Sequence, residues 1–232
     1  MQKAGFAVAK TPLRKELLKA IFFIHFCRSF MNTGKKNIAI FASGGGTNAA
    51  NILACQGRAF KNGQYPRYNV SLIVCNKPEA GVLQIAAGNG VPSLIIEKDR
   101  FFRGDAYIPE FLSRNIDIIV LAGFLWKVPS HLISHFPKKI INIHPALLPK
   151  YGGKGMYGHH VHEAIINAGE KESGITIHYV DEIYDHGQTI LQATCPVLTD
   201  DTADSLARRI HELEYMHYPA AVDFICAMSE KA

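Results

Sequence analysis

From Asn37 onward, the chain alternates between short apolar runs and stretches with helical spacing. Five runs are typical of buried strands: NIAIFA at 37–42, NVSLIVC at 69–75, SLII at 93–96, IDIIVLA at 116–122 and IINI at 140–143. Residues 48–56, 81–88, 107–114 and 129–135 lie between them and have the apolar spacing and turn residues of helices. This alternation predicts an α/β fold with a mostly parallel sheet covered by helices on both faces.

The last third of the chain follows a different pattern. Residues 176–180 and 189–197 are two strand-like runs with no helix between them, which predicts an antiparallel addition to the sheet. Residues 202–228 have the spacing of one long helix, and Pro219 predicts an interruption in it because proline lacks a backbone N–H. The fold expected from the pattern is therefore a parallel sheet with an antiparallel C-terminal part.

Composition excludes several classes of protein. The 232 residues are 48% hydrophobic and 19% charged, which suits one globular domain or one domain with appendages. No uninterrupted apolar run reaches the length of a membrane span. The net charge of +5 is spread along the chain, which argues against nucleic-acid binding and fits either anionic metabolites or ordinary surface lysines. The five cysteines are widely scattered, as expected of reduced thiols in a cytoplasmic protein.

The first 36 residues are a leader of uncertain role, and residues 37–232 form the predicted domain. Leu17–Cys27 is apolar and follows basic residues, but Lys19 and His25 interrupt it and no small-residue cleavage site follows. Met31 precedes the first strand directly, so a mis-assigned upstream start would explain the leader. An added amphipathic helix and an organelle presequence are the alternatives.

The segment INIHPALLP at 141–149 carries the strongest chemical signal. Asn142 and His144 are two residues apart at a strand end, so their side chains point the same way. An amide donor beside a titratable imidazole suits addition to a carbonyl, where one steadies the oxyanion and the other handles a proton. Asp185, two residues before Gly187 in a predicted turn, is the candidate that orients the imidazole. We therefore take Asn142, His144 and Asp185 as the catalytic candidates, the alternative for His144 being a structural role.

Three further histidines have spacing that could suggest a metal site: His159, His160 and His162. No cysteine completes a ligand set, and a flexible loop explains the three equally well, so we expect no metal.

The glycine cluster SGGGTN at 43–48 follows the first strand directly. Glycines let the backbone approach a ligand, and the following helix offers free N–H groups to an anion. Gly44, Gly46 and Ala49 fit the start of a dinucleotide fingerprint, but the second predicted strand ends without a carboxylate. A mononucleotide or sugar phosphate is therefore expected rather than NAD, and the alternative is a tight turn without a ligand.

Four segments together resemble the phosphoribosylglycinamide formyltransferases, the folate-dependent enzymes of purine synthesis. They are SGGGTN, LAGFLWKVP at 121–129, INIHPALLPKY at 141–151 and GITIHYVDEIYDHGQTILQ at 174–192, and the resemblance extends from Asn37 to Phe224. It implies a Rossmann-like twisted sheet and transfer of a formyl group from 10-formyltetrahydrofolate to the amine of glycinamide ribonucleotide. It implies no metal.

The resemblance also implies roles for individual residues. It places Asn142, His144 and Asp185 on the catalytic triad. It implies that the ribose phosphate is bound by Gly46, Thr47, Asn48 and Glu214. It implies that the folate is bound by Leu125, Trp126, Lys127, Val128 and Asn142. His178 and Arg103 are supporting residues. Many members have Met and Arg where this chain has Leu125 and Trp126, and Arg103 is the nearest substitute for a displaced arginine.

Other functions remain open at this point. A formyltetrahydrofolate hydrolase resembles the same core but has an N-terminal regulatory domain, and methionyl-tRNA formyltransferase needs a basic C-terminal domain. A non-catalytic nucleotide-binding module would need SGGGTN without the three catalytic candidates. Small-molecule substrates, a cytoplasmic location and a monomer or homodimer are expected.

Overall fold

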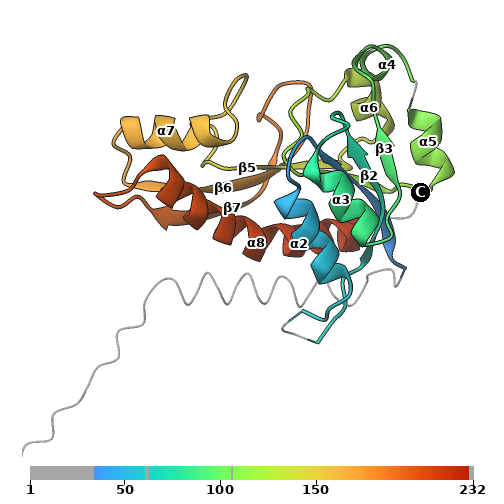
Figure 1. Ribbon diagram of the computed structural model, residues 1–232, viewed down its shortest axis with the longest axis horizontal. Helices are drawn as coiled ribbons and strands as arrows, with labels where there is room; N and C mark the ends of the chain where they lie inside the picture. Colours follow the sequence, from blue (N-terminus) through green and yellow to red (C-terminus); the bar gives the residue numbers. More distant parts are fainter. Residues whose placement is uncertain (1–33, 61–62, 106, 230–232) are drawn as a thin grey trace, which may run out of the picture. The chain divides into compact units, whose positions relative to one another are not determined.

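A seven-stranded sheet forms the centre of the fold (Figure 1). The computed structural model describes residues 34–229 except 61–62 and 106, so residues 1–33 of the leader, which include Leu17–Cys27 and Met31, lie outside the described residues, and Lys36 already belongs to the first strand. The strands are β1 (Lys36–Ala42), β2 (Tyr68–Cys75), β3 (Ser93–Ile95), β4 (Ile118–Leu121), β5 (Ile140–His144), β6 (Glu172–Tyr179) and β7 (Thr189–Pro196). Their order is β3-β2-β1-β4-β5-β6-β7. The first five pair in parallel and β6 and β7 are antiparallel, which confirms the predicted fold class.

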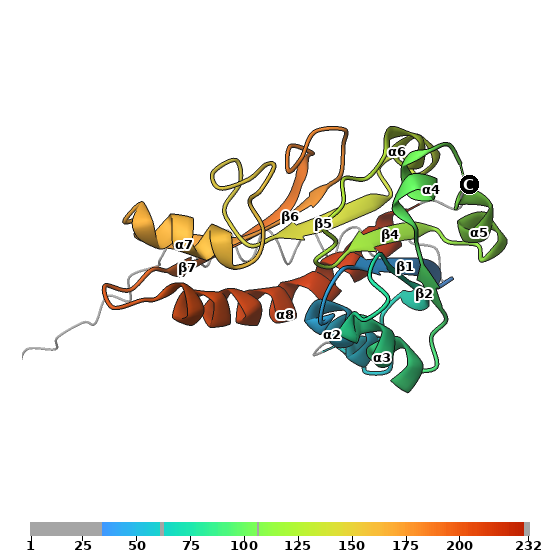
Figure 2. The ribbon, with the colours of Figure 1, turned by 45° about the horizontal axis from the view of Figure 1, so that its top comes forward.

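Helices cover both faces of the sheet. They are α2 (Thr47–Gln56), α3 (Gly81–Gly88), α4 (Lys98–Phe102), α5 (Ile108–Ser113), α6 (Ser130–His135), α7 (His159–Asn167) and α8 (Ala203–Met228). Figure 2 shows α2, α3 and α8 on one side of the strands and α4, α5 and α6 on the other. Helix α7 packs against α8 at the end of the sheet formed by β6 and β7.

Alternation along β1 divides the core into two layers. Ile38, Ile40 and Ala42 pack in the layer that includes α2, α3 and α8. Ala39 and Phe41 pack in the opposite layer with α4, α5 and α6. Successive side chains of a strand point to opposite faces, so one fully buried strand supplies both layers.

The strand order places a crevice at the carboxyl ends of β1, β4 and β5. Strand β1 lies between β2 and β4, so the chain turns in opposite directions from β1 in the two halves of the sheet. Ligands of open α/β sheets bind at such a switch point. The glycine cluster follows the end of β1, residues 123–128 follow the end of β4, and Asn142–His144 forms the carboxyl end of β5.

The structure differs from the sequence prediction at three helices. Helices α4 and α7 were not expected, and the continuous helix α8 shows that the predicted interruption near Pro219 is wrong. Pro219 cannot donate to the carbonyl of Tyr215. The Nδ2 of Asn51 on α2 donates to that carbonyl at 2.9 Å, so the helix continues with the acceptor satisfied from outside.

No helix among the described residues combines the length and apolar character that crossing a bilayer requires.

The buried His162 on α7 makes the folding stability depend on pH. Its side chain is 3% exposed and its Nδ1 has no hydrogen-bond partner among the described residues. Burial, with the nearby His211 and His159, lowers the pKa of His162 from 6.5 to about 4. A group with a depressed pKa stabilises the fold above its unfolded pKa and loses that contribution as pH falls toward the folded value.

We expect His162 to cost about 2 kcal/mol of folding stability between pH 7 and pH 5, because the unfolded chain binds a proton there and the folded chain does not. Denaturant unfolding of His162→Gln should therefore show a flatter pH dependence than the parent chain. His160→Gln, at an exposed neighbouring histidine, is the control. Equal slopes in His162→Gln and the parent would contradict the assignment.

Candidate active site

Strands β5 and β6 bring the first two polar groups together. Asn142 and His178 are directly paired across these antiparallel strands, and His144 is paired with Thr176. Paired residues of adjacent strands extend on the same face. The Nδ2 of Asn142 consequently lies 3.1 Å from the Nε2 of His178. The sequence alone indicated Asn142 and His144, whereas the position of His178 depends on this register.

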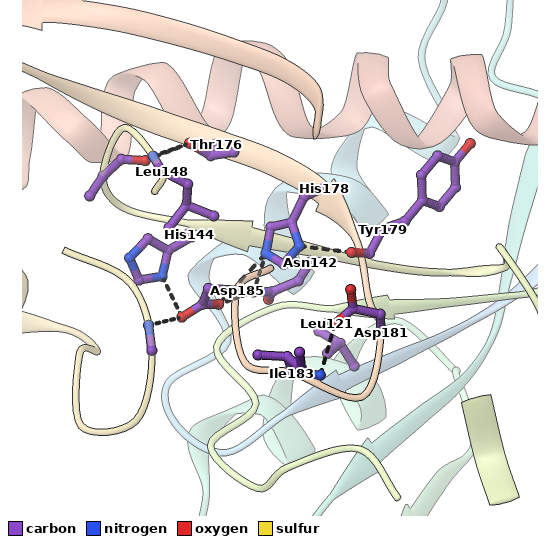
Figure 3. A network of polar contacts seen from close by, with 12 residues as sticks. Leu121, Asn142, His144, Leu148, Thr176, His178, Tyr179, Asp181, Ile183 and Asp185 are labelled. Carbon is purple, nitrogen blue, oxygen red and sulfur yellow. Dashed lines mark hydrogen bonds and ion pairs between the residues drawn. The ribbon is translucent and has the colours of Figure 1, made fainter. Parts of the chain in front are cut away.

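Asp185 reaches the same point from the loop between β6 and β7 (Figure 3). Its backbone is left-handed, with φ of 53°, a conformation that Asp adopts more readily than most residues. One carboxylate oxygen accepts from the backbone N–H of Gly153 at 2.9 Å and lies 3.6 Å from Nδ1 of His144. The other lies 3.5 Å from Nδ2 of Asn142 and 3.6 Å from Nε2 of His178. The structure thus brings Asn142, His144, Asp185 and His178 together.

The ring of His144 is held by a backbone carbonyl. Its Nε2 lies 2.7 Å from the carbonyl oxygen of Tyr151, so the hydrogen-bond pattern places a proton on Nε2. Burial lowers the pKa of His144, although the Asp185 carboxylate and the Tyr151 carbonyl act in the opposite direction. Desolvation of the ring therefore has a larger effect on this pKa than the Asp185 carboxylate has. A neutral ring leaves Nδ1 able to accept a proton.

Asp185 remains ionised despite its burial. Burial alone would raise the pKa of this carboxyl, but the neighbouring imidazoles of His178 and His144 and the N–H of Gly153 hold the pKa below its usual value. A carboxylate 3.6 Å from Nδ1 of His144 stabilises the imidazolium once that nitrogen takes a proton. The pair can therefore accept a proton without first carrying one.

Asn142 has one amide proton more firmly engaged than the other. His178 donates from Nδ1 to the carbonyl of Tyr179 at 2.8 Å, which leaves Nε2 as the acceptor for Asn142 at 3.1 Å. The second contact of Asn142, with Asp185, is 3.5 Å long and at the limit of a hydrogen bond. The amide N–H on that side can therefore donate a hydrogen bond to an incoming carbonyl oxygen.

A second set of contacts fixes the turn after His144. Thr176 donates to the carbonyl of Ala146 at 2.7 Å and accepts from the N–H of Leu148 at 3.0 Å. Gln192 donates to the carbonyl of Leu148 at 2.9 Å. This turn leads to Tyr151, whose carbonyl holds His144, so Thr176 and Gln192 orient the imidazole indirectly. No local sequence pattern indicates either residue, because only the pairing of β5, β6 and β7 places them there.

A cavity of ≈ 450 Å³ opens over these groups. The residues expected at the folate pocket all line it: Leu125, Trp126, Lys127, Val128 and Asn142. The sequence did not indicate further lining residues, which include Phe124, Lys154, Met156, Tyr157, Ile183 and Tyr184. Arg103 is not part of the lining, and its side chain is 82% exposed and 4.0 Å from Asp99. The structure therefore does not bring Arg103 to the cavity.

The glycine cluster lies beside this cavity rather than in its lining. Gly46 precedes α2 with φ of 79°, and a Cβ at this position would lie 2.7 Å from Val82. Ser43 accepts from the N–H of Leu125 at 2.9 Å, which ties the glycine cluster to the cavity wall. The first turn of α2, which begins with exposed Thr47, offers free N–H groups to an anion.

Asn48 and Glu214 form a buried polar pair next to the glycine cluster. The Nδ2 of Asn48 donates to Glu214 at 2.9 Å, and the side-chain oxygen of Asn48 has no partner among the described residues. Burial raises the pKa of Glu214, and the hydrogen bond from Asn48 opposes that shift. Buried polar atoms without partners are uncommon, and they favour a polar ligand at this position. The pair joins α2 to α8 across 166 residues of sequence.

The described residues contain no cluster of three or more groups suited to a metal ion. His159, His160 and His162 lie on helix α7, so the flexible-loop alternative for them is wrong. His159 and His160 are near Glu163, at 3.3 and 3.5 Å, and His162 faces inward. The polar sequence of this helix conceals a buried side that includes Val161.

The formyl transferase family matches residues 36–222. The chain is 39% identical over 197 residues to phosphoribosylglycinamide formyltransferase, chloroplastic, of Arabidopsis thaliana, which covers 83% of this chain. It is 32% identical over 200 residues to phosphoribosylglycinamide formyltransferase of Bacillus subtilis, which covers 84% of this chain and 97% of that protein.

A solved structure of glycinamide ribonucleotide transformylase 1 from Geobacillus kaustophilus has a TM-score of 0.74 at 34% identity, and the match covers 83% of this chain and 99% of that one. The chain spans slightly less than two thirds of the plant relatives, 66% of the Arabidopsis protein and 64% of a relative from Vigna unguiculata. It spans nearly the whole of the two bacterial proteins.

Proposed function

We propose that this chain, which belongs to the formyl transferase family, transfers a formyl group from 10-formyltetrahydrofolate to the amine of glycinamide ribonucleotide, a step of purine synthesis. The observation that carries the proposal is the convergence of an amide, an imidazole and a carboxylate, from Asn142, His144 and Asp185, in the lining of one cavity. These three groups supply an oxyanion donor, a proton acceptor and a charge that stabilises the protonated acceptor.

The reaction forms one carbon–nitrogen bond and breaks another. The substrate amine attacks the formyl carbon, and the more weakly engaged amide proton of Asn142 steadies the developing oxyanion. His144 accepts the amine proton, directly or through water, and the Asp185 carboxylate stabilises the imidazolium that forms. The proton passes to N10 of the folate as the bond between N10 and the formyl carbon breaks. Atoms and charge balance without a metal or a covalent intermediate.

The two substrates approach the triad from different sides. The apolar side chains of Leu125, Trp126 and Val128 suit the ring system of the donor. The glycine cluster with Asn48 and Glu214 suits the ribose phosphate. The donor is proposed to be a formyl folate because family relatives are named formyltransferases. Substrate binding then positions the amine next to the formyl carbon, which is a large part of the catalysis.

The test that separates transfer from hydrolysis varies the acceptor. Without glycinamide ribonucleotide, we expect 10-formyltetrahydrofolate to be consumed slowly, because no bound amine displaces water. Adding the ribonucleotide should raise tetrahydrofolate release at least tenfold, with formylated ribonucleotide forming in equal amount. Formate release that ignores the ribonucleotide would favour the hydrolase, and no consumption under either condition would favour a nucleotide-binding module.

The cytoplasmic location remains a prediction, since two of the plant relatives are chloroplastic. The monomer or homodimer also remains a prediction. Size-exclusion chromatography with light scattering measures the second directly.

A further inference from the structure

One short segment holds both members of the His144–Asp185 pair, which face each other in Figure 3. The carbonyl oxygen of Tyr151 lies 2.7 Å from Nε2 of His144, and the N–H of Gly153 donates to the Asp185 carboxylate at 2.9 Å. Both contacts come from backbone atoms, so they depend on the path of the chain at residues 151–153. Whatever fixes this path therefore also fixes the imidazole against the carboxylate.

The backbone of this segment is strained at Tyr151. Its φ is 56°, in the left-handed region that an aromatic residue rarely adopts. A residue stays in this region only where its surroundings hold it there. The next residue is closely packed, because a Cβ at Gly152 would lie 2.5 Å from the side chain of Leu148 and 3.2 Å from that of Asp185. The chain path at Tyr151 consequently needs a restraint that its own conformational preference does not supply.

Tyr151 borders a second cavity, which has a volume of ≈ 300 Å³. This cavity shares no lining residue with the one over the triad. Its lining includes Ile165 on α7 and Ser173 on β6. Side chains do not fill this space, so apolar packing alone does not hold Tyr151 in place.

A carboxylate from the turn between α7 and β6 reaches the side chain of Tyr151. One oxygen of Glu170 accepts from the phenol of Tyr151 at 2.9 Å and from Nζ of Lys150 at 2.8 Å. These two hydrogen bonds hold the pKa of Glu170 below its usual value. A bond from a hydroxyl to a carboxylate is stronger than one between neutral groups, whereas an exposed lysine pair contributes little. The bond to the phenol is therefore the main restraint on Tyr151 at this cavity.

We propose that Glu170 is a positioning residue for the reaction, because it holds the phenol of Tyr151 and so fixes the carbonyl that orients His144. This inference rests on the proposed function. Glu170 does not line the 450 Å³ cavity, so it acts through Tyr151 and His144 and not on a substrate.

Tyr151→Phe and Glu170→Ala each remove the bond between the phenol and the carboxylate. We expect each to lower kcat about tenfold and to leave KM for both substrates within about twofold, since a small misplacement of a catalytic group mainly slows the chemical step. The double variant should lose no more than either single variant, because both substitutions remove the same contact. Steady-state turnover with 10-formyltetrahydrofolate and glycinamide ribonucleotide measures these losses.

Two variants separate the bond to Tyr151 from the charge of Glu170. Glu170→Gln keeps an oxygen that accepts from the phenol, so it should retain most of kcat. Lys150→Met leaves the bond between Glu170 and Tyr151 in place and should do the same. Glu172→Ala is the matched control, because Glu172 is exposed, lines the same cavity and has no hydrogen bond to Tyr151 among the described residues.

The pKa of His144 gives a readout that does not depend on turnover. The hydrogen bond with the Tyr151 carbonyl raises this pKa, against the effect of burial. Loosening that bond in Tyr151→Phe or Glu170→Ala should therefore lower the pKa of His144 and move the acidic limb of the kcat profile to lower pH. The other titratable groups that interact with this ring are unchanged in every variant: Asp185, His178 and His162. An NMR titration of the ring measures the pKa without substrates.

Unchanged kcat and an unchanged His144 pKa in Glu170→Ala and Tyr151→Phe would overturn the assignment. An equal loss in Glu170→Gln or Lys150→Met would also overturn it, because the charge and not the phenol contact would then matter. The same holds for a loss of turnover that only matches a loss of folded protein, measured by circular dichroism. If the parent chain transfers no formyl group but the His144 pKa still falls in the two variants, the proposed function fails and the positioning role of Glu170 stands.

Discussion

Replacing Asn142 by alanine is expected to lower turnover by about a hundredfold or more, because one oxyanion donor is typically worth about 3 kcal/mol. His144→Ala and Asp185→Asn should each cause a loss of similar size. Asp185→Asn retains the shape of the side chain and tolerates the left-handed backbone at this position, so its effect should reflect the charge. Steady-state turnover with both substrates, at saturating concentrations, measures each loss.

The losses of turnover in the three single variants should not multiply when the substitutions are combined. The amide, the imidazole and the carboxylate act on the same developing charges and the same proton, so the triple variant should lose far less than the product of the single losses. His186→Ala is the matched control, because His186 is an exposed histidine on the loop of Asp185 and does not line the 450 Å³ cavity. A purified single variant that folds normally and turns over normally would remove its residue from the mechanism.

The sequence predicted the strands well because each is a short, continuous apolar run. Such runs are typical of strands buried on both faces, and β1 supplies residues to both core layers. Helix α7 was missed because His159, His160 and Glu163 make its exposed side polar, and nine residues give little periodicity to read. The continuity of α8 past Pro219 depends on Asn51, which is distant in sequence, so no local pattern reveals it.

The candidate site shows a similar division. Asn142 and His144 share one strand end, so their proximity follows from local geometry. The tautomers of His178 and His144 depend on the carbonyls of Tyr179 and Tyr151, and the lowered pKa of His144 depends on burial. These are consequences of the folded chain path, and a linear pattern does not contain them. The prediction that Arg103 supports the folate pocket was wrong for the same reason, since its position in the sequence does not indicate its distance from the cavity.

Gly45→Val is expected to weaken glycinamide ribonucleotide binding by about a hundredfold while leaving folate binding unchanged. A Cβ at Gly45 would meet no atom within 4 Å and the backbone there is not left-handed, so the variant should fold normally. Its side chain would occupy the space through which a phosphate approaches the N–H groups of α2. Losing two charged hydrogen bonds of about 1.5 kcal/mol each gives about 3 kcal/mol, or a hundredfold in affinity.

Gly46→Val serves as the comparison for Gly45→Val, because it should also destabilise the fold. Gly46 has φ of 79°, and its added Cβ would lie 2.7 Å from Val82, so this variant should lower the melting temperature and weaken both ligands. Calorimetry with each ligand separately, together with thermal melts, distinguishes the two outcomes. Normal ribonucleotide affinity in Gly45→Val would place the phosphate elsewhere, because a branched side chain at the centre of SGGGTN cannot coexist with a phosphate held by that backbone.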